Sequence, residues 1–194
     1  MSKFFKILKD WWFPFLIACL AYIYISCFAT AEVNGSSMFP TYEDGDFLLL
    51  YKTTDVDYDD IVAIDSTSLN KILCKRIIGL AGDNIVINKE GITRNGVLLE
   101  EPYISTSNWS INYDLDIVVD ENSVFVMGDN RLHSTDSRDL GCLNTQAIHG
   151  VSIINFTSLC GLTRQRLGQI TLLFWIICGL FLIFGKKRRS TKEG

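Results

Sequence analysis

Two uncharged apolar runs flank a polar middle segment, and this arrangement constrains the chain more than any other feature. Residues 11–30 contain no charged side chain, and the run from Leu167 to Gly185 is also uncharged. About 20 apolar residues are enough to cross the hydrocarbon core of a bilayer. We therefore expect transmembrane helices at 11–30 and 167–185, with a separate domain of residues 31–166 between them.

The charges at the two ends predict the orientation of these spans. Eight of the 18 Lys and Arg residues lie in residues 1–10 and 186–194, against two of the 22 Asp and Glu residues. Basic flanks stay in the cytoplasm. The N-terminal 1–10 and the basic tail 186–194 are therefore expected inside the plasma membrane and the middle domain outside it. The acidic middle also argues against nucleic acid as a partner.

The first apolar run has a second interpretation as a cleavable signal peptide. Ala29-Thr30-Ala31 fits an A-x-A cleavage site, and basic residues precede the run. However, the run is longer than the usual apolar region of a signal peptide, and Trp11 and Trp12 resemble interfacial anchors. An uncleaved anchor is favoured, and self-cleavage after Ala31 stays open.

The middle segment consists of short apolar runs separated by turn residues. Asn84 to Asn88 alternates strictly between polar and apolar residues, and Asn95-Gly96 is a strong hairpin signal. Residues 103–116 show no clear period and are expected to form a loop. This pattern predicts a mainly antiparallel β domain, with further strands expected at Asp46–Tyr51, Asp60–Asp65, Ile72–Leu80 and Asp120–Met127.

Three blocks of residues in this β background can carry chemistry. The Gly-containing turn Asn34–Thr41 presents Ser37, and such a turn can aim backbone N–H groups at one point, as an oxyanion hole requires. Lys75 lies within an apolar strand, where burial disfavours the ammonium and lowers its pKa. A neutral lysine near a serine can act as a general base. The third block, Met127–Arg138, is densely polar directly after an apolar strand.

Taken together, the three blocks resemble the signal peptidase I family of bacterial preprotein peptidases. The matching patterns are G-x-S-M-x-P-T at Gly35–Thr41, G-D at Gly45-Asp46, K-R-I-I-G-L-x-G-D at Lys75–Asp83, and G-D-N-R-x-x-S-x-D-S-R at Gly128–Arg138. Their order and spacing match as well. Each block alone is a weak signal, but all of them in order are highly specific.

The resemblance implies a Ser-Lys catalytic dyad. Ser37 matches the nucleophile, and its backbone N–H would contribute to the oxyanion hole. Lys75 matches the general base. Ser134 matches a serine that hydrogen-bonds and orients that lysine.

The remaining matched positions are implied to support the site. Asp129 is expected to pair with Arg76, and Asp136 with Arg138. Two further residues, Met38 and Pro40, would shape the turn and line the substrate pocket. The family is built from two antiparallel sheets and needs no metal or cofactor. No C-x-x-C pattern that would indicate a zinc site occurs in the sequence.

The implied activity is that of a membrane-bound serine endopeptidase that removes signal peptides from secreted preproteins after small residues, in an A-x-A pattern. Its implied partners are preprotein signal peptides and the lipid bilayer, with the secretion translocon as a further candidate. The chain departs from the family at two of the matched positions. Ala81 stands where proline is usual, and Gly35 stands where some members have a serine that donates to the oxyanion.

Other interpretations remain. His133 could serve as the base in place of Lys75, as in the Ser-His signal peptidases of the endoplasmic reticulum. Ser68–Lys71 matches S-x-x-K, but the S-D-N and K-T-G patterns of penicillin-binding proteins are missing. Self-cleaving repressors also use a Ser-Lys pair, yet they carry a DNA-binding domain and no membrane span. An inactive membrane-tethered scaffold is the non-enzymatic alternative.

Overall fold

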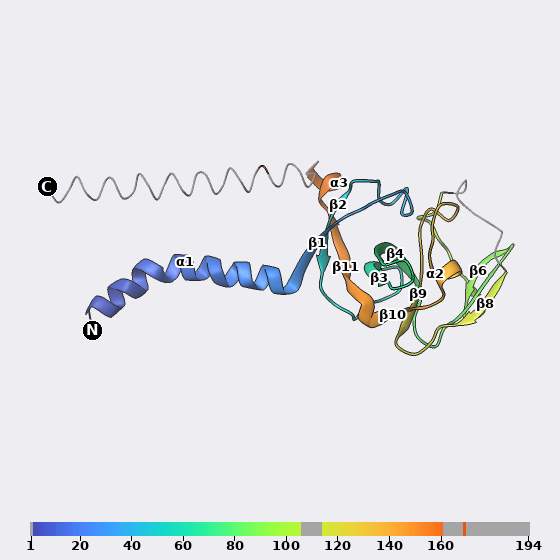
Figure 1. The fold of residues 1–194 in the computed structure, drawn as a ribbon, viewed down its shortest axis with the longest axis horizontal. Coiled ribbons are helices and arrows are strands. Elements are labelled where there is room, and N and C mark those ends of the chain that lie inside the picture. The colour runs from blue at the N-terminus through green and yellow to red at the C-terminus, as the bar shows by residue number, and fades with distance from the viewer. Residues whose placement is uncertain (1, 106–113, 161–168, 170–194) are drawn as a thin grey trace.

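A long N-terminal helix leads into a body of two antiparallel sheets in the computed structural model of the chain (Figure 1). The structure describes residues 2–105, 114–160 and 169. The elements in chain order are α1 (Ser2–Cys27), β1 (Phe28–Glu32), β2 (Phe47–Tyr51), β3 (Ile61–Ser66), β4 (Lys71–Gly79), β5 (Asn84–Asn88), β6 (Gly91–Arg94), β7 (Val97–Leu98), β8 (Leu115–Val118), β9 (Ser123–Met127), α2 (Ser137–Leu140), β10 (Leu143–Asn144), the 3₁₀ turn η2 (Thr145–Ala147), β11 (Ile148–Asn155) and α3 (Phe156–Cys160).

The larger sheet has seven strands in the order β1-β2-β11-β3-β4-β9-β10, with antiparallel neighbours throughout. Strand β4 occupies a special place in it. Its residues 71–76 pair with β3, whereas its pairing with β9 begins only at Arg76. The first half of β4 therefore has a strand partner on one side only.

The smaller sheet has four strands in the order β7-β6-β5-β8. The predicted hairpin is present, because β6 and β7 are joined at Asn95 and Gly96, and both residues have positive φ (55° and 79°), as two-residue hairpin turns require. Strand β8 (Leu115–Val118) was not predicted, since its first two residues fall in the region expected to be a loop and its last two were assigned to no element. Its alternate residues Leu115 and Ile117 are partly buried and pack onto the core, a pattern too short to distinguish from a loop in the sequence.

Two hydrophobic clusters fill the body and explain why these segments form strands. One lies within the larger sheet around Val62, Ile64 and Ile77, and the other joins the smaller sheet to β9 through Ile85, Ile92 and Phe125. Most of these side chains are β-branched, which favours the extended backbone. The predicted mainly β fold with two antiparallel sheets is confirmed.

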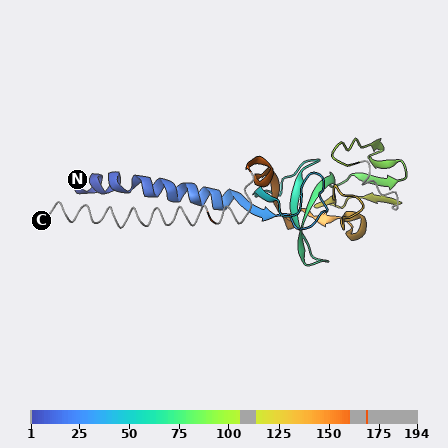
Figure 2. The ribbon, with the colours of Figure 1, turned by 90° about the horizontal axis from the view of Figure 1, so that it is seen from above.

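Helix α1 runs directly into β1 and projects away from the sheets (Figure 2). Residues 28–30, expected to complete the apolar span, belong to β1 instead, where Phe28 pairs with Tyr51. The reason is that Ala29 and Ala31 pack against a third apolar cluster, so the run of apolar residues continues past the end of the helix. Ala29-Thr30-Ala31 thus lies within a paired strand.

The end of α1 is tied to β2 by its own hydrogen bonds. The Nζ atom of Lys52 donates to the carbonyl of Ile25 at 2.7 Å, and its backbone N–H donates to the carbonyl of Cys27 at 2.8 Å. These bonds satisfy carbonyls that the helix itself leaves without partners. The rings of Phe28 and Tyr51 lie 5.8 Å apart beside them.

Within the described part of the chain, no helix qualifies by length and hydropathy as a membrane span. The second expected span, 167–185, and the basic tail, 186–194, lie outside the described residues apart from position 169.

Candidate active site

The turn that carries Ser37 connects β1 to β2. Gly35 takes φ +91°, a left-handed conformation that glycine adopts without strain, and its N–H donates to Asp44 at 2.6 Å. Met38 is fully buried and anchors the turn to the core, while Ser37 stays partly accessible. The local sequence therefore presents the Ser37 hydroxyl at the surface of a fixed turn.

Lys75 lies in β4 with its side chain almost fully buried, at 3% exposure. Its Nζ atom lies 2.6 Å from Ser37 Oγ and 3.0 Å from the carbonyl oxygen of Cys74. The structure therefore brings the two predicted dyad residues into direct contact, although they are far apart in the sequence.

The surroundings of Lys75 favour its neutral form. Burial lowers the pKa of Lys75 below its ordinary value, and the negative charge of Asp136 only partly opposes this. Lys75 forms no ion pair with a carboxylate within the part of the chain that the structure describes. Such an amine can accept a proton at a lower pH than a solvated lysine can.

Asp136 organises the third block. Its carboxylate accepts hydrogen bonds from Arg138, from the backbone N–H of Gly128 and from the hydroxyl of Ser134, and it caps the short helix α2. Burial raises the pKa of Asp136, but the bonds from Arg138, Gly128 and Ser134 outweigh burial and hold that pKa below its ordinary value. The expected ion pair of Asp136 with Arg138 is present at 2.8 Å.

The arrangement of Ser134 differs from the expectation. Its Oγ donates to Asp136 at 2.7 Å, and no hydrogen bond joins it to Lys75. A charged carboxylate is a stronger acceptor than a neutral amine, which explains why the hydroxyl turns toward Asp136. The expected direct contact of Ser134 with Lys75 is therefore corrected to a contact with the carboxylate that faces Lys75.

Gly128 lets the third block approach the nucleophile turn closely. A Cβ atom at this position would collide with the Ser134 hydroxyl and with the backbone carbonyl of Ser37. Asn130 then holds the turn with two bonds, from its N–H to the Ser37 carbonyl and from its Nδ2 to the Ser36 carbonyl, both at 3.0 Å. Asn130 was part of the recognised pattern, but no feature of the sequence indicated this contact.

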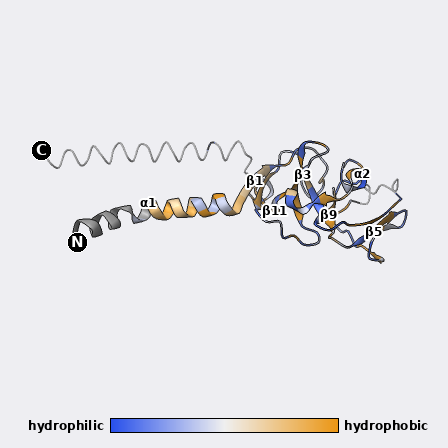
Figure 3. Ribbon diagram, turned by 60° about the horizontal axis from the view of Figure 1, so that its bottom comes forward, coloured by the Kyte–Doolittle hydropathy of each residue, from blue (hydrophilic) through white to orange (hydrophobic). Residues whose placement is uncertain are grey.

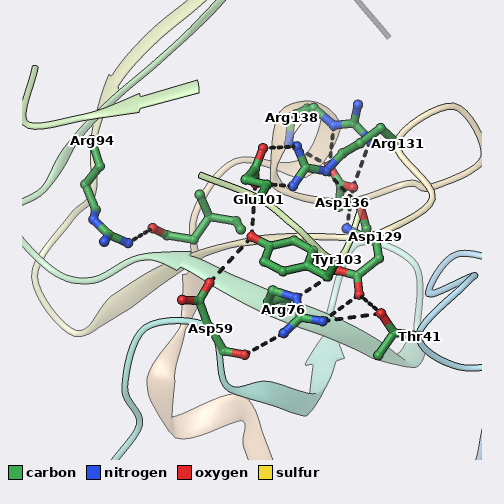
Figure 4. A network of polar contacts seen from close by, with 12 residues as sticks. Thr41, Asp59, Arg76, Arg94, Glu101, Tyr103, Asp129, Arg131, Asp136 and Arg138 are labelled. Carbon is green, nitrogen blue, oxygen red and sulfur yellow. Dashed lines mark hydrogen bonds and ion pairs between the residues drawn. The ribbon is translucent and has the colours of Figure 1, made fainter. Parts of the chain in front are cut away.

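The expected ion pair of Arg76 with Asp129 is also present and buried (Figure 4). Arg76 donates to both carboxylate oxygens, at 2.9 and 2.6 Å, and Asp129 has no exposed surface. Thr41 contacts the same carboxylate, and the carbonyl of Asp59 accepts from the Arg76 guanidinium at 2.9 Å. Four separate segments of the chain thus meet around Asp129.

Sequence reasoning missed two residues of this network, Glu101 and Tyr103. Glu101 forms an ion pair with Arg131, and the ring of Tyr103 lies over the Arg76 guanidinium with 3.9 Å to the ring centroid. Tyr103 is the first residue of the presumed loop and Glu101 lies two residues before it, so both are outside every recognised block. The only local signal is the sequence Glu-Pro-Tyr itself, because proline favours a turn at that point.

A cavity of about 330 Å³ opens beside the dyad. Ser37 and Lys75 lie in its wall. The rest of the wall comes from β1, β2, β3 and the first half of β4, and its side chains are mostly apolar or small: Ala31, Leu48, Leu50, Ala63, Ile72 and Cys74. Met38 was expected to line this pocket, but it is buried beneath the turn and is not part of the cavity wall. Pro40 faces a different, shallow and polar pocket with Thr41 and Asp46.

The alternative base does not reach the nucleophile. The His133 side chain is exposed, and no hydrogen bond joins it to Ser37. His149 forms an exposed ion pair with Asp65 at 2.9 Å, and neither residue belongs to the network around Ser37. Among the residues that the structure describes, no group of His, Cys, Asp and Glu side chains could hold a metal ion.

Comparison with known proteins gives the same relatives throughout. The family described as "Signal peptidase, peptidase S26" matches residues 8–157. A signal peptidase I of Bacillus licheniformis is 34% identical over 160 residues, which cover 75% of this chain and 86% of that protein. One from Streptococcus pneumoniae is 27% identical over 189 residues, 77% of this chain and 93% of that protein. A solved signal peptidase I structure from Enterococcus faecalis is 31% identical, with a TM-score of 0.44, covering 50% of this chain and 96% of that chain.

Proposed function

The chain belongs to the signal peptidase S26 family of serine proteases, and from this premise we propose that it removes signal peptides with a Ser37–Lys75 dyad. The observation that carries the proposal is the 2.6 Å contact between Lys75 Nζ and Ser37 Oγ, made by a buried lysine whose pKa is lowered. A general base needs this distance and a neutral form near the working pH.

In the proposed mechanism, Ser37 Oγ attacks the scissile carbonyl while neutral Lys75 takes its proton. Lys75 then gives this proton to the leaving amine, and water hydrolyses the acyl-enzyme with the lysine again as base. The N–H of Ser37 donates no hydrogen bond within the described residues. It is therefore available to the oxyanion, and Gly35, which has no hydroxyl, leaves this task to backbone donors or water.

The cavity beside the dyad supports a substrate with small residues before the cleaved bond. Ala31, Leu50 and Ala63 give its wall an apolar character, which suits small apolar side chains such as alanine. Residues 71–75 of β4, which have a strand partner on one side only, border the same cavity, so an extended peptide can pair with their free side as an added strand. We infer from this arrangement an A-x-A pattern of cleavage.

We also propose that α1 anchors the enzyme in the plasma membrane. Much of α1 carries the hydrophobic colour in Figure 3. Consecutive apolar residues of this helix are exposed, including Phe15 at 70%, Leu16 at 43% and Ile17 at 50%. Aromatic side chains stand near the two ends of the apolar part of the helix, at Trp12 and Tyr24. Lipid would cover an apolar surface that extends around this part of the helix.

The remaining parts of this topology rest on the sequence. The second span at 167–185 and the cytoplasmic location of both ends stay predictions, as does the location of residues 31–166 outside the membrane. In this arrangement the dyad lies just beyond the end of α1, where the cleavage sites of membrane-inserted preproteins are exposed. Signal peptides and lipid are the proposed partners, and the translocon stays an untested candidate.

The test is cleavage of a preprotein with an A-x-A site in detergent, across a range of pH. Ser37→Ala and Lys75→Ala are expected to lower kcat by roughly 10³-fold or more, since each removes one half of the dyad. The matched control is Lys71→Ala, an exposed lysine of the same strand, which should retain activity. Because only neutral Lys75 is a base, wild-type activity should rise with pH through its lowered pKa.

Two results would contradict this proposal. Cleavage that survives in Lys75→Ala would exclude the dyad and favour another base such as His133. A wild-type protein that binds preproteins but cleaves none of them would favour the scaffold function.

A further inference from the structure

We propose that Glu101 and Tyr103 are positioning residues of the active site, which hold Arg76 and Arg131 and, through them, the loop that fixes Ser37. The kinetic part of this inference rests on the proposed function. We call Glu101–Tyr103 the clamp segment, and Figure 4 shows its two side chains directed toward the two arginines.

A tight turn places both side chains of the clamp segment on the same partners. The N–H of Ile104 donates to the Glu101 carbonyl at 3.1 Å, which closes a four-residue turn with Pro102 at its second position. Proline is preferred there because its fixed φ matches the turn. The Tyr103 hydroxyl then donates to Glu101 Oε1 at 3.0 Å, so the two side chains support each other.

The first half of the clamp is the ion pair of Glu101 with Arg131. Both side chains are nearly inaccessible, at 8% and 1% exposure, and two nitrogens of Arg131 meet the two oxygens of Glu101. Such bidentate pairs fix orientation as well as charge. The Nε atom of Arg131 is left to donate to the Gly128 carbonyl at 3.1 Å, so Glu101 orients the group that holds the loop.

The second half is the stacking of Tyr103 on Arg76. This arginine directly follows Lys75 in β4 and donates two bonds to Asp129. Burial, followed by the charge of Glu101, raises the pKa of Tyr103, so its hydroxyl stays protonated and remains a donor. The ring therefore covers the guanidinium without competing for Asp129.

Both halves act on the same short loop. Arg131 binds Gly128, Arg76 binds Asp129, and Asn130 holds the carbonyls of Ser36 and Ser37. A shift of this loop would move Ser37 relative to Lys75, and misplacement by about 1 Å can cost roughly 10²-fold in rate. The clamp segment comes from outside the recognised blocks, yet it completes the support of the dyad.

The chain offers a matched control for the clamp. Tyr58 stacks on Arg94 at 3.6 Å and donates to Asp83 at 3.1 Å, which is the same chemistry as Tyr103 on Arg76 and Glu101. Neither Tyr58 nor its partners contact the dyad. Tyr103→Phe and Tyr58→Phe each keep the ring and remove one hydroxyl, so they separate positioning from general stability.

The experiment measures kcat and KM on a short A-x-A peptide for wild type, Glu101→Gln, Tyr103→Phe and Tyr58→Phe, with the melting temperature of each. Glu101→Gln is expected to lower kcat by about 10- to 100-fold and Tyr103→Phe by about 3- to 10-fold, with KM within 2-fold. Tyr58→Phe is expected to match wild type in kcat. Equal kcat in wild type and Glu101→Gln, or an equal loss in Tyr58→Phe, would overturn the clamp.

Amide hydrogen exchange tests the clamp independently of cleavage. It shows whether the clamp holds the loop even if the wild type cuts no peptide and the proposed function fails. In Glu101→Gln the amides of residues 128–131 should exchange at least about 10-fold faster than in wild type, because the loop opens locally. In Tyr58→Phe they should be unchanged. Unaltered exchange of these amides in Glu101→Gln would show that the clamp does not hold the loop.

Discussion

The two sheets are made of similar short antiparallel strands, but they bury different kinds of side chain. In β5 to β8 every buried residue is apolar or glycine. In the larger sheet, β4 buries Lys75 and Arg76, and the segment after β9 buries Asp129, Asp136 and Arg138. Most of the buried charges among the described residues are therefore concentrated at one place, where β4 and β9 meet.

This difference shows how a β scaffold can hold a lysine without neutralising it by an ion pair. Each buried arginine has its own carboxylate, which satisfies both charges. Among the described residues, Lys75 instead makes hydrogen bonds only with a hydroxyl and a backbone carbonyl. The strands of the smaller sheet contribute no charged side chain to this arrangement. They support it through apolar packing against β9.

The largest expected effect tests the buried charges of the larger sheet. Asp129→Ala leaves Arg76 buried without its partner, and such a break typically costs about 3–5 kcal/mol in the free energy of unfolding. Denaturant unfolding would measure it. The double replacement Arg76→Met with Asp129→Leu should recover most of this loss, since an apolar pair of similar volume is often tolerated. A loss below 1 kcal/mol in Asp129→Ala would mean that water reaches Arg76.

An intermediate effect is expected from Lys75→Met, through the pH dependence of stability. The pKa of Lys75 is lowered by folding, so between that value and the ordinary lysine pKa the unfolded chain binds more protons. The free energy of unfolding of the wild type should therefore rise with pH in this window, by up to about 1.4 kcal/mol per pH unit.

Lys75→Met removes this titration. The free energy of unfolding of Lys75→Met minus that of the wild type should therefore fall as pH rises. Unfolding at several pH values between 7 and 10 would measure it. A difference that is constant with pH would indicate that Lys75 is equally solvated in both states. Lys71→Met, at an exposed position of the same strand, is the control.

The smallest effect is expected in the smaller sheet. Ile85→Val removes one methyl group from its fully buried core and should cost about 0.5–1.5 kcal/mol in the free energy of unfolding. Cleavage activity should stay within about 2-fold of wild type, because no charge or turn of the site moves. A loss of activity much larger than the loss of stability would show that the apolar support is coupled to the dyad.

The sequence was sufficient for the parts of the site that lie in local patterns. A lysine inside an apolar strand predicts burial, and the turn around Ser37 and the ion pairs of Asp129 and Asp136 followed from the resemblance. Alternation and the Asn95-Gly96 dipeptide predicted strands and a hairpin of the smaller sheet because both signals act over neighbouring residues.

The remaining features depend on contacts between distant segments. Tyr103 gives no sign in the sequence that it covers Arg76, and β8 is too short for its alternation to be recognised. The hydroxyl of Ser134 donates to the charged carboxylate of Asp136 and not to the amine of Lys75. This preference depends on the positions of the two groups in space, which the sequence does not show. The end of the first apolar run was misplaced because helix and strand both use apolar residues there.

The direct passage from α1 to β1 has a mechanical consequence. No loop separates them, and Lys52 fastens the last turn of the helix to the sheet. Ala31, in the same strand, forms part of the cavity wall beside the dyad. A change in the tilt of α1 is therefore expected to move β1 as well, and with it the wall of the cavity beside the dyad.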